Sequence, residues 1–158
     1  MRYFEKISFE QFSKDIKNDK ELYESYNLPK RETKYAAGYD IYSLEDFILK
    51  PTEIIKIPTG IKVNMNDDEV LLLIDRSSQG FKYNVRICNQ VGVIDKDYYN
   101  NEDNEGHMFI KLKNEGDKEY VVKKKEKICQ GIFINYLKTD DEESVINERK
   151  SGIGSTGK

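Results

Sequence analysis

The chain has 158 residues, of which 37% are hydrophobic and 35% are charged, so it is long enough for one domain with a core but polar for a globular protein. Its net charge of −3 argues against binding to duplex nucleic acid, because that affinity comes mainly from Lys and Arg side chains on phosphates. No apolar stretch approaches the length of a membrane span, and the N-terminal residues lack an apolar signal region. We therefore expect a soluble, cytoplasmic protein with no nucleic-acid or membrane partner.

Residues 8–26 have the pattern of a helical segment. Ser8 and Gln11 have the spacing of a capping box. Apolar and aromatic residues recur at helical intervals on both sides of the polar pair Asn18-Asp19. The segment is therefore either one bent helix or two short helices, and Leu28-Pro29 ends it.

From Ala36 onward the pattern is one of strands and turns. The continuous apolar run Val70–Ile74 is typical of a strand buried on both faces. The predicted strands are Thr52–Ile57, Ile61–Met65, Val70–Ile74, Val85–Cys88, Val91–Ile94, Met108–Leu112, Tyr120–Val122 and Ile128–Leu137. Many short strands at regular spacing predict an all-β sandwich or barrel, here over residues 1–138 with a helical insert at about 8–26.

Two polar segments interrupt or follow this pattern. Tyr99–Glu105 lies between two predicted strands, and we expect it to project from the surface as a loop. Residues 139–158 begin with an acidic tether, Thr139–Glu148, and end in a Gly-rich arm. Nothing in the composition of this C-terminal part would hold it down alone, so we expect a flexible arm.

The segment Asn89–Tyr98 carries the strongest indication of chemistry. A short apolar strand, Val93-Ile94, runs directly into the acidic residues Asp95 and Asp97. A carboxylate at the end of a rigid strand can act as a general base, although an acidic turn alone would have the same sequence. A C-terminal run of Gly, Ser and Thr can wrap phosphates. Together these features indicate chemistry on a phosphorylated ligand that contains a ring.

Five short segments then occur in a recognisable order. They are Ala36–Ser43, Asp75–Gly80, Asn89–Tyr98, Lys127–Phe133 and Arg149–Gly157. This set resembles the five-motif signature of the trimeric dUTP diphosphatases (dUTPases) over residues 28–158. The resemblance implies a distorted jelly-roll or β-clip fold and a homotrimer whose active sites are shared among subunits. It also implies hydrolysis of dUTP to dUMP and pyrophosphate with Mg²⁺.

The resemblance also implies roles for individual residues. Asp95 would activate the water that attacks the α-phosphorus in line. Tyr98 would pack against the deoxyribose and leave no room for a 2′-hydroxyl group. Uracil would be held by the backbone of a hairpin, whose residues are Asn89, Gly92, Val93 and Ile94.

Phosphate and metal contacts are implied for residues elsewhere in the chain. The phosphate-binding residues would be Arg76, Ser77, Ser78 and Gln130. Asp40 would act on Mg²⁺ indirectly, through water. The arm residues that would close over the nucleotide are Arg149, Ile153, Gly154, Ser155 and Thr156. Because Ile153 stands where the family normally has an aromatic residue, we expect weaker ordering of the arm and a higher KM.

Two other functions remain open at this point. The first is a dCTP deaminase of the same fold. The second is a dUTPase scaffold with a regulatory role, in which an unknown protein partner would bind the loop at 99–105. The single histidine, His107, is interpreted as structural or solvent-facing, and Cys88 and Cys129 as small buried hydrophobic residues.

Overall fold

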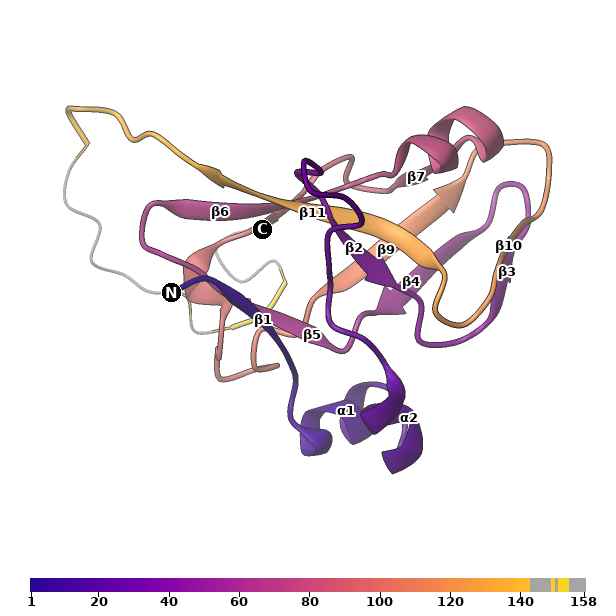
Figure 1. Cartoon of the computed structure of the whole chain (residues 1–158), viewed down its shortest axis with the longest axis horizontal. Helices are drawn as coiled ribbons and strands as arrows, with labels where there is room; N and C mark the ends of the chain where they lie inside the picture. Colours follow the sequence, from indigo (N-terminus) through magenta and orange to yellow (C-terminus); the bar gives the residue numbers. More distant parts are fainter. Residues whose placement is uncertain (143–148, 150, 154–158) are drawn as a thin grey trace.

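Antiparallel strands make up most of the computed structural model (Figure 1), in which residues 1–142, 149 and 151–153 are described. The strands are β1 (Tyr3–Lys6), β2 (Tyr39–Tyr42), β3 (Phe47–Leu49), β4 (Ile54–Pro58), β5 (Ile61–Asn64), β6 (Glu69–Ile74), β7 (Val85–Ile87), β8 (Gly92–Ile94), β9 (Phe109–Asn114), β10 (Tyr120–Val122) and β11 (Lys127–Asn135). The helical elements are α1 (Phe9–Asp15), α2 (Lys20–Ser25), the π-helical turn η1 (Gln79–Tyr83) and the 3-10 turn η2 (Lys96–Tyr98).

Within the described part of the chain, the strands form small open sheets. Their strand orders are β2-β11-β6-β8, β4-β9-β7, β1-β5 and β3-β10. The predicted all-β fold is confirmed, as a layered arrangement of open sheets and not as a closed barrel. Strand β6 pairs on both sides, and its Leu71 and Leu73 side chains are fully buried. This agrees with the continuous apolar run that the sequence shows there.

Each predicted strand has a counterpart whose ends differ by a few residues, but β1, β2 and β3 were not predicted. These strands have four, four and three residues, which is too short for a clear alternation of apolar and polar side chains. Each pairs with a strand distant in the sequence, β1 with β5, β2 with β11 and β3 with β10. Such pairing leaves no local signal.

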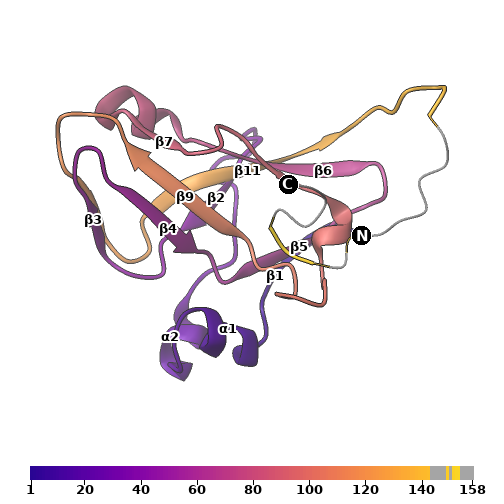
Figure 2. The ribbon, with the colours of Figure 1, turned by 180° about the vertical axis from the view of Figure 1, so that it is seen from behind.

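The N-terminal segment forms two short helices below β1 and β5 (Figure 2). Ser8 caps α1, since its hydroxyl oxygen accepts a hydrogen bond of 3.0 Å from the backbone N–H of Gln11. The other half of the predicted capping box is wrong, because the Gln11 side chain donates to Asp15 instead. The Ser8 backbone N–H donates to the Glu105 carboxylate at 2.9 Å. In the described residues, neither helix nor any other element is a long apolar helix of the kind that crosses a membrane.

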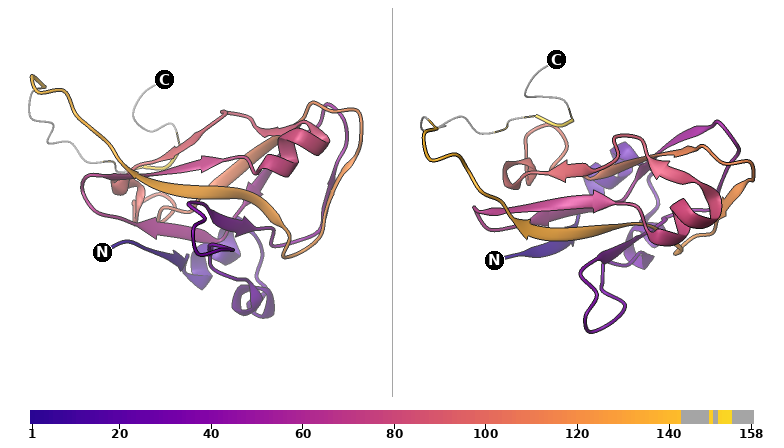
Figure 3. Two further views of the ribbon diagram at one scale, coloured as in Figure 1. Left: turned by 45° about the horizontal axis from the view of Figure 1, so that its top comes forward. Right: turned by 90° about the horizontal axis from the view of Figure 1, so that it is seen from above.

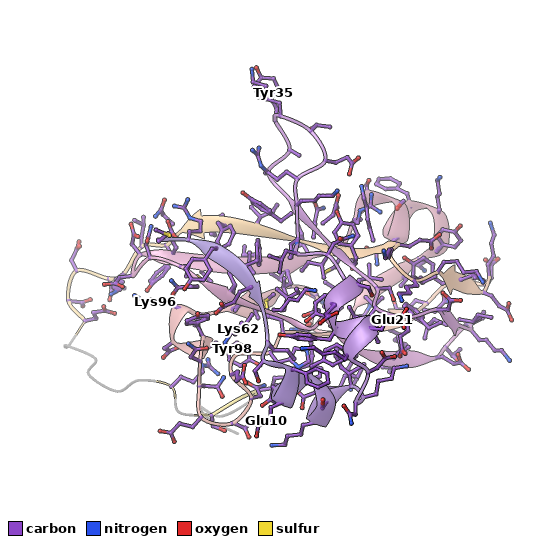
Figure 4. The ribbon with its side chains drawn as sticks, turned by 60° about the horizontal axis from the view of Figure 1, so that its bottom comes forward. Glu10, Glu21, Tyr35, Lys62, Lys96 and Tyr98 are labelled. Carbon is purple, nitrogen blue, oxygen red and sulfur yellow. The ribbon has the colours of Figure 1, made fainter. Side chains whose placement is uncertain are left out.

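The loop over residues 99–105 folds back on the molecule, so the expectation of a projecting loop is wrong. Asn101 is buried, and its side chain binds the backbone of Tyr98 at 2.8 Å and that of Asn104 at 3.0 Å. Lys62 donates to the Asn100 side chain at 2.7 Å. Figure 4 shows Lys62 and Tyr98 at the same end of the molecule. Contacts with α1 and β5 therefore hold this loop in place.

Gly60, in the turn between β4 and β5, connects the helices to the loop. Its carbonyl oxygen accepts hydrogen bonds from the Ile7 backbone N–H at 3.0 Å and from the Tyr26 hydroxyl at 2.8 Å. Its N–H donates to Nε2 of His107 at 2.9 Å, and His107 Nδ1 lies 2.6 Å from the Asp15 carboxylate. His107 is fully buried, which resolves its two predicted readings in favour of the structural one. Because Nε2 accepts a bond, the imidazole is neutral with its proton on Nδ1.

Gly60→Ala should lower the free energy of unfolding by about 2–4 kcal/mol, because two costs combine there. Gly60 has a φ of 73°, and a Cβ would lie 2.8 Å from Cζ of Tyr26. Gly80→Ala is the matched control, since a Cβ at Gly80 meets no atom within 4 Å. Urea unfolding should show a change of about 0.5 kcal/mol or less for the control. Equal losses of stability in the two variants would contradict the special role of Gly60.

Burial lowers the pKa of His107, although hydrogen bonding to Asp15 opposes the shift. The unfolded chain, with a pKa of about 6.5, therefore takes up the proton first as the pH falls. The stabilisation that comes from keeping His107 neutral should be complete above about pH 6.5. The free energy of unfolding should decrease as the pH falls from there toward the folded pKa.

Since His107 is the only histidine, its imidazole NMR signals report this pKa directly. We expect a value below about 6.5. Between about pH 7.5 and pH 5.5, His107→Gln should lose less stability than the wild type. A folded pKa at or above the free value would refute the neutral assignment.

Candidate functional site

A cavity of about 260 Å³ brings together the predicted base-binding, catalytic and arm residues. The predicted residues that line it are Asn89, Gly92, Val93, Ile94, Asp95, Tyr98, Arg149 and Ile153. Leu73, Ile87, Met108, Phe109 and Ile110 complete the lining. A cavity lined by apolar side chains together with polar and charged ones, here Asn89, Asp95 and Arg149, is typical of a site for a small ligand with a ring.

A tight turn before β8 shapes one wall of this cavity. The Val91 N–H donates to the Asn89 carbonyl at 2.7 Å, and Gln90 has a φ of 65°. The positive φ of this turn falls on Gln90 and not on Gly92. Gly92 is needed for packing, because a Cβ there would lie 3.0 Å from the Leu73 side chain on β6. The turn joins β7 and β8, which belong to different sheets, so the predicted hairpin is wrong. The close approach of Gly92 presses this turn against the central strand β6.

Asp95 lies at the end of β8, and one 3-10 turn brings Tyr98 beside it. The Tyr98 N–H donates to the Asp95 carbonyl at 3.1 Å, which closes this turn. The Asp95 side chain is 51% exposed at the cavity edge, whereas Tyr98 is buried. Burial raises the pKa of Tyr98, so its hydroxyl stays protonated and donates to the His107 carbonyl at 2.7 Å. An accessible carboxylate thus stands beside a fixed aromatic ring.

Arg149 of the arm contacts both carboxylates of the acidic turn. Its guanidinium lies 3.0 Å from Asp95 and 3.4 Å from Asp97, and its backbone N–H donates to Asp97 at 2.9 Å. The Gly152 N–H donates to Asp103 at 3.2 Å, beside the loop that follows η2 (Figure 3). Ile153 lines the cavity but is 71% exposed. The predicted arm residues Gly154, Ser155 and Thr156 lie outside the described residues.

The predicted phosphate-binding residues gather in a second cluster. Arg76 Nε lies 3.2 Å from the Asp40 carboxylate, and Lys127 Nζ lies 3.0 Å from the other oxygen of that carboxylate. Gln130 donates one amide hydrogen to the Asp75 carbonyl at 3.0 Å. The remaining members of the cluster are Ser77, which is exposed, and Ser78, which is half-buried. Asp40 therefore acts here as a buried carboxylate that orients Arg76.

Gln79 and Asp75, which hold the phosphate cluster in place, were not predicted as site residues. The buried Gln79 side chain accepts from the Arg76 N–H at 2.8 Å and donates to the Ile128 carbonyl at 2.6 Å. Asp75 accepts from the Ile87 N–H at 2.9 Å and so joins the turn to β7. The only sequence signal for Gln79 is a polar residue between two small ones, which says nothing about its partners.

The two clusters lie at opposite ends of the β6–β8 ladder. Leu71 pairs with Ile94 and Leu73 with Gly92, so Asp95 lies level with Val70. Arg76 is six residues further along, or about 20 Å at the usual rise per residue in a strand. Figure 1 shows η1, drawn in pink beside β7, and η2, drawn in salmon near the N-terminus, at opposite ends of the molecule. One chain therefore does not bring Asp95 and Arg76 into the same site.

Known proteins share both the sequence and the fold. A family model described as dUTPase matches residues 24–157. The deoxyuridine 5′-triphosphate nucleotidohydrolase of Lactococcus lactis is 51% identical over 132 residues, which cover 83% of this chain and 88% of that protein. A crystal structure of dUTPase from Streptococcus mutans has a TM-score of 0.70 and 40% identity, and covers 87% of this chain and 98% of that one.

A mutant dUTPase from phage phi11 of S. aureus, whose structure describes the coordination of a structural Mg(II) ion, has a TM-score of 0.67. Its identity is 22%, over 93% of this chain and 97% of that one, so it supports the fold alone. The predicted resemblance is thus confirmed at the level of sequence and of fold. The chain belongs to the dUTPase family.

Proposed function

We propose that the protein hydrolyses dUTP to dUMP and pyrophosphate, by in-line attack of a water that Asp95 activates on the α-phosphorus. The observation that carries this proposal is the cavity in which the Asp95 carboxylate stands beside Tyr98 and the turn before β8. A carboxylate at the cavity edge can take the proton of a water while the rest of the cavity holds a base and a sugar. The same activity belongs, by name, to the L. lactis relative.

The turn before β8 gives the cavity its selectivity for uracil. Its backbone N–H and C=O groups are positioned rigidly, because Gly92 is pressed against Leu73. Cytosine presents the opposite pattern of donors and acceptors and would leave buried groups unpaired, which can reject an analogue by roughly 10⁴-fold. The buried ring of Tyr98 forms the wall against the sugar.

A homotrimer with shared active sites accounts for the separation of the two clusters. Asp95 and the phosphate-binding residues must all lie within a few ångströms of the same triphosphate. In one chain Arg76 is about 20 Å from Asp95 along the ladder. The phosphate cluster of one subunit would therefore complete the cavity of another.

Mg²⁺ would enter with the triphosphate. Among the described residues, no group of three or more His, Cys, Asp or Glu side chains could hold a metal by itself. This fits an ion that keeps most of its waters and binds chiefly to phosphate oxygens. Asp40, beside Arg76, is the carboxylate that would reach it through water. When bound, Mg²⁺ would neutralise charge on the leaving pyrophosphate.

The dCTP deaminase alternative is less well supported, because the family match and the relatives described above are dUTPases. Incubation with dCTP and an ammonia assay would detect it. A protein partner at the loop 99–105 would have to bind a surface that already packs against the N-terminal segment and β5. Its exposed part consists of Asn100, Glu102 and Asp103.

Asp95→Asn should lower kcat for dUTP by about 10²- to 10⁴-fold, because the amide cannot accept the proton of the water. Binding of dUTP should persist, since the cavity keeps its shape. Asp117→Asn is the control, because Asp117 is an exposed aspartate that does not line the cavity. Pyrophosphate release from each dNTP measures the effect, and we expect release from dUTP alone. An active Asp95→Asn variant would refute the assigned base.

Ile153→Phe should lower KM for dUTP by several-fold with little change in kcat. Ile153 lines the cavity but is largely exposed, and an aromatic ring there would cover a bound base more fully. Stacking of this kind is worth about 0.5–1.5 kcal/mol, or roughly two- to tenfold in affinity. Steady-state kinetics on both proteins is the measurement, and an unchanged KM would count against an arm that closes over the base.

A further inference from the structure

The hydroxyl group of Tyr98 is held by residues that lie outside the five family motifs. It donates to the His107 carbonyl at 2.7 Å and accepts from the Asn104 side-chain amide at 2.9 Å. Both partners belong to the segment that follows η2. The aromatic wall of the cavity is therefore fixed through its hydroxyl group by two residues that do not themselves line the cavity.

The orientation of Asn104 is determined by its own partners. Its side-chain oxygen accepts from the Asn101 amide at 2.8 Å and from the Gly106 N–H at 3.1 Å. Because both partners are donors, this atom must be the oxygen, and the amide nitrogen must face Tyr98. Asn104 is thus a pre-arranged donor to the tyrosine hydroxyl.

The other partner of Tyr98 is equally constrained. His107 is fully buried, with one ring nitrogen bound to Asp15 on α1 and the other to Gly60. Gly106 has a φ of 87°, and a Cβ there would lie 2.6 Å from the Tyr98 carbonyl oxygen. The loop therefore packs closely against the backbone of Tyr98, and the contact of His107 with α1 holds it there.

We propose that Asn104 is a positioning residue that sets the sugar selectivity of the enzyme, by fixing the Tyr98 ring through its hydroxyl group. This inference rests on the proposed function, in which that ring excludes a 2′-hydroxyl group. Steric exclusion of one oxygen atom requires a wall that does not yield by a fraction of an ångström. If the Tyr98 hydroxyl loses one of its two hydrogen-bond partners, the ring can pivot away from the sugar and admit UTP.

The test compares kcat/KM for dUTP with kcat/KM for UTP in the full-length protein. Asn104→Ala should lower this ratio by about five- to tenfold, the value of one buried hydrogen bond. Most of the change should come from faster hydrolysis of UTP. Glu102→Ala is the matched control, since this exposed residue of the same loop should leave the ratio unchanged.

A double-mutant cycle with Tyr98→Phe separates positioning from general damage to the loop. If Asn104 acts through the tyrosine hydroxyl, Asn104→Ala should change the ratio less than about twofold in the Tyr98→Phe background. An equal fall in both backgrounds, or an unchanged ratio in the single variant, would overturn the proposal. Should Asn104→Ala not fold, Asn104→Asp replaces it, because Asp keeps the acceptor for Gly106 and removes the donor to Tyr98.

The proposed function is tested separately in the same experiment, by hydrolysis of dUTP by the wild type. If the wild type releases no pyrophosphate, that function fails, and the inference is then judged by calorimetry with dUMP and UMP. Asn104→Ala should then narrow the difference in affinity between the two nucleotides. An unchanged difference would overturn the inference by this second measurement also.

Discussion

The antiparallel pairing of β6 with β8 is the constraint on which the site depends. It presses Gly92 against Leu73 and sets Asp95 level with Val70, at the opposite end of the ladder from Arg76. A slip of one residue would turn every side chain of β8 to the other face. The apolar lining of the cavity would then face away from it. The same register separates Asp95, the proposed general base, from the predicted phosphate-binding residues around Arg76, so one chain keeps these two groups apart.

The N-terminal helices, most of which lie outside the family match, support the cavity at a distance. Helix α1 has seven residues, or about 10 Å of length, and a helix so short is not stable in isolation. Glu105 binds its first turn through Ser8, and His107 binds its last residue, Asp15. Burial raises the pKa of Glu105, but hydrogen bonds from Ser8 and the charge of Lys62 outweigh this effect. The pKa is therefore lowered overall, and the carboxylate stays ionised. The loop and the helix thus stabilise each other, and Tyr98 is fixed as a result.

What the sequence predicted well depends on local pattern. The helical segment, most strands and the acidic turn after β8 follow from periodicity and short motifs within a few residues. The jelly-roll fold and the roles of single residues came from the resemblance to a family. The strands β1, β2 and β3 and the buried Gln79 could not be found in this way, because each depends on contacts with distant segments. The approximately 20 Å between the clusters follows only from the strand register.

The cavity and the phosphate cluster also differ in how they would respond to a nucleotide. In the cavity, the hydroxyl of Tyr98 already has both of its partners, so this wall need not rearrange. In the phosphate cluster, Arg76 is paired with Asp40, and a triphosphate would compete for the same guanidinium. Leaving a buried carboxylate without a partner is strongly unfavourable, by about 3–5 kcal/mol. Lys127 prevents this cost, since it lies 3.0 Å from Asp40 independently of Arg76. Arg76 can therefore turn toward a phosphate group while Asp40 stays paired with Lys127. The presence of Lys127 thus makes Arg76 available to the nucleotide.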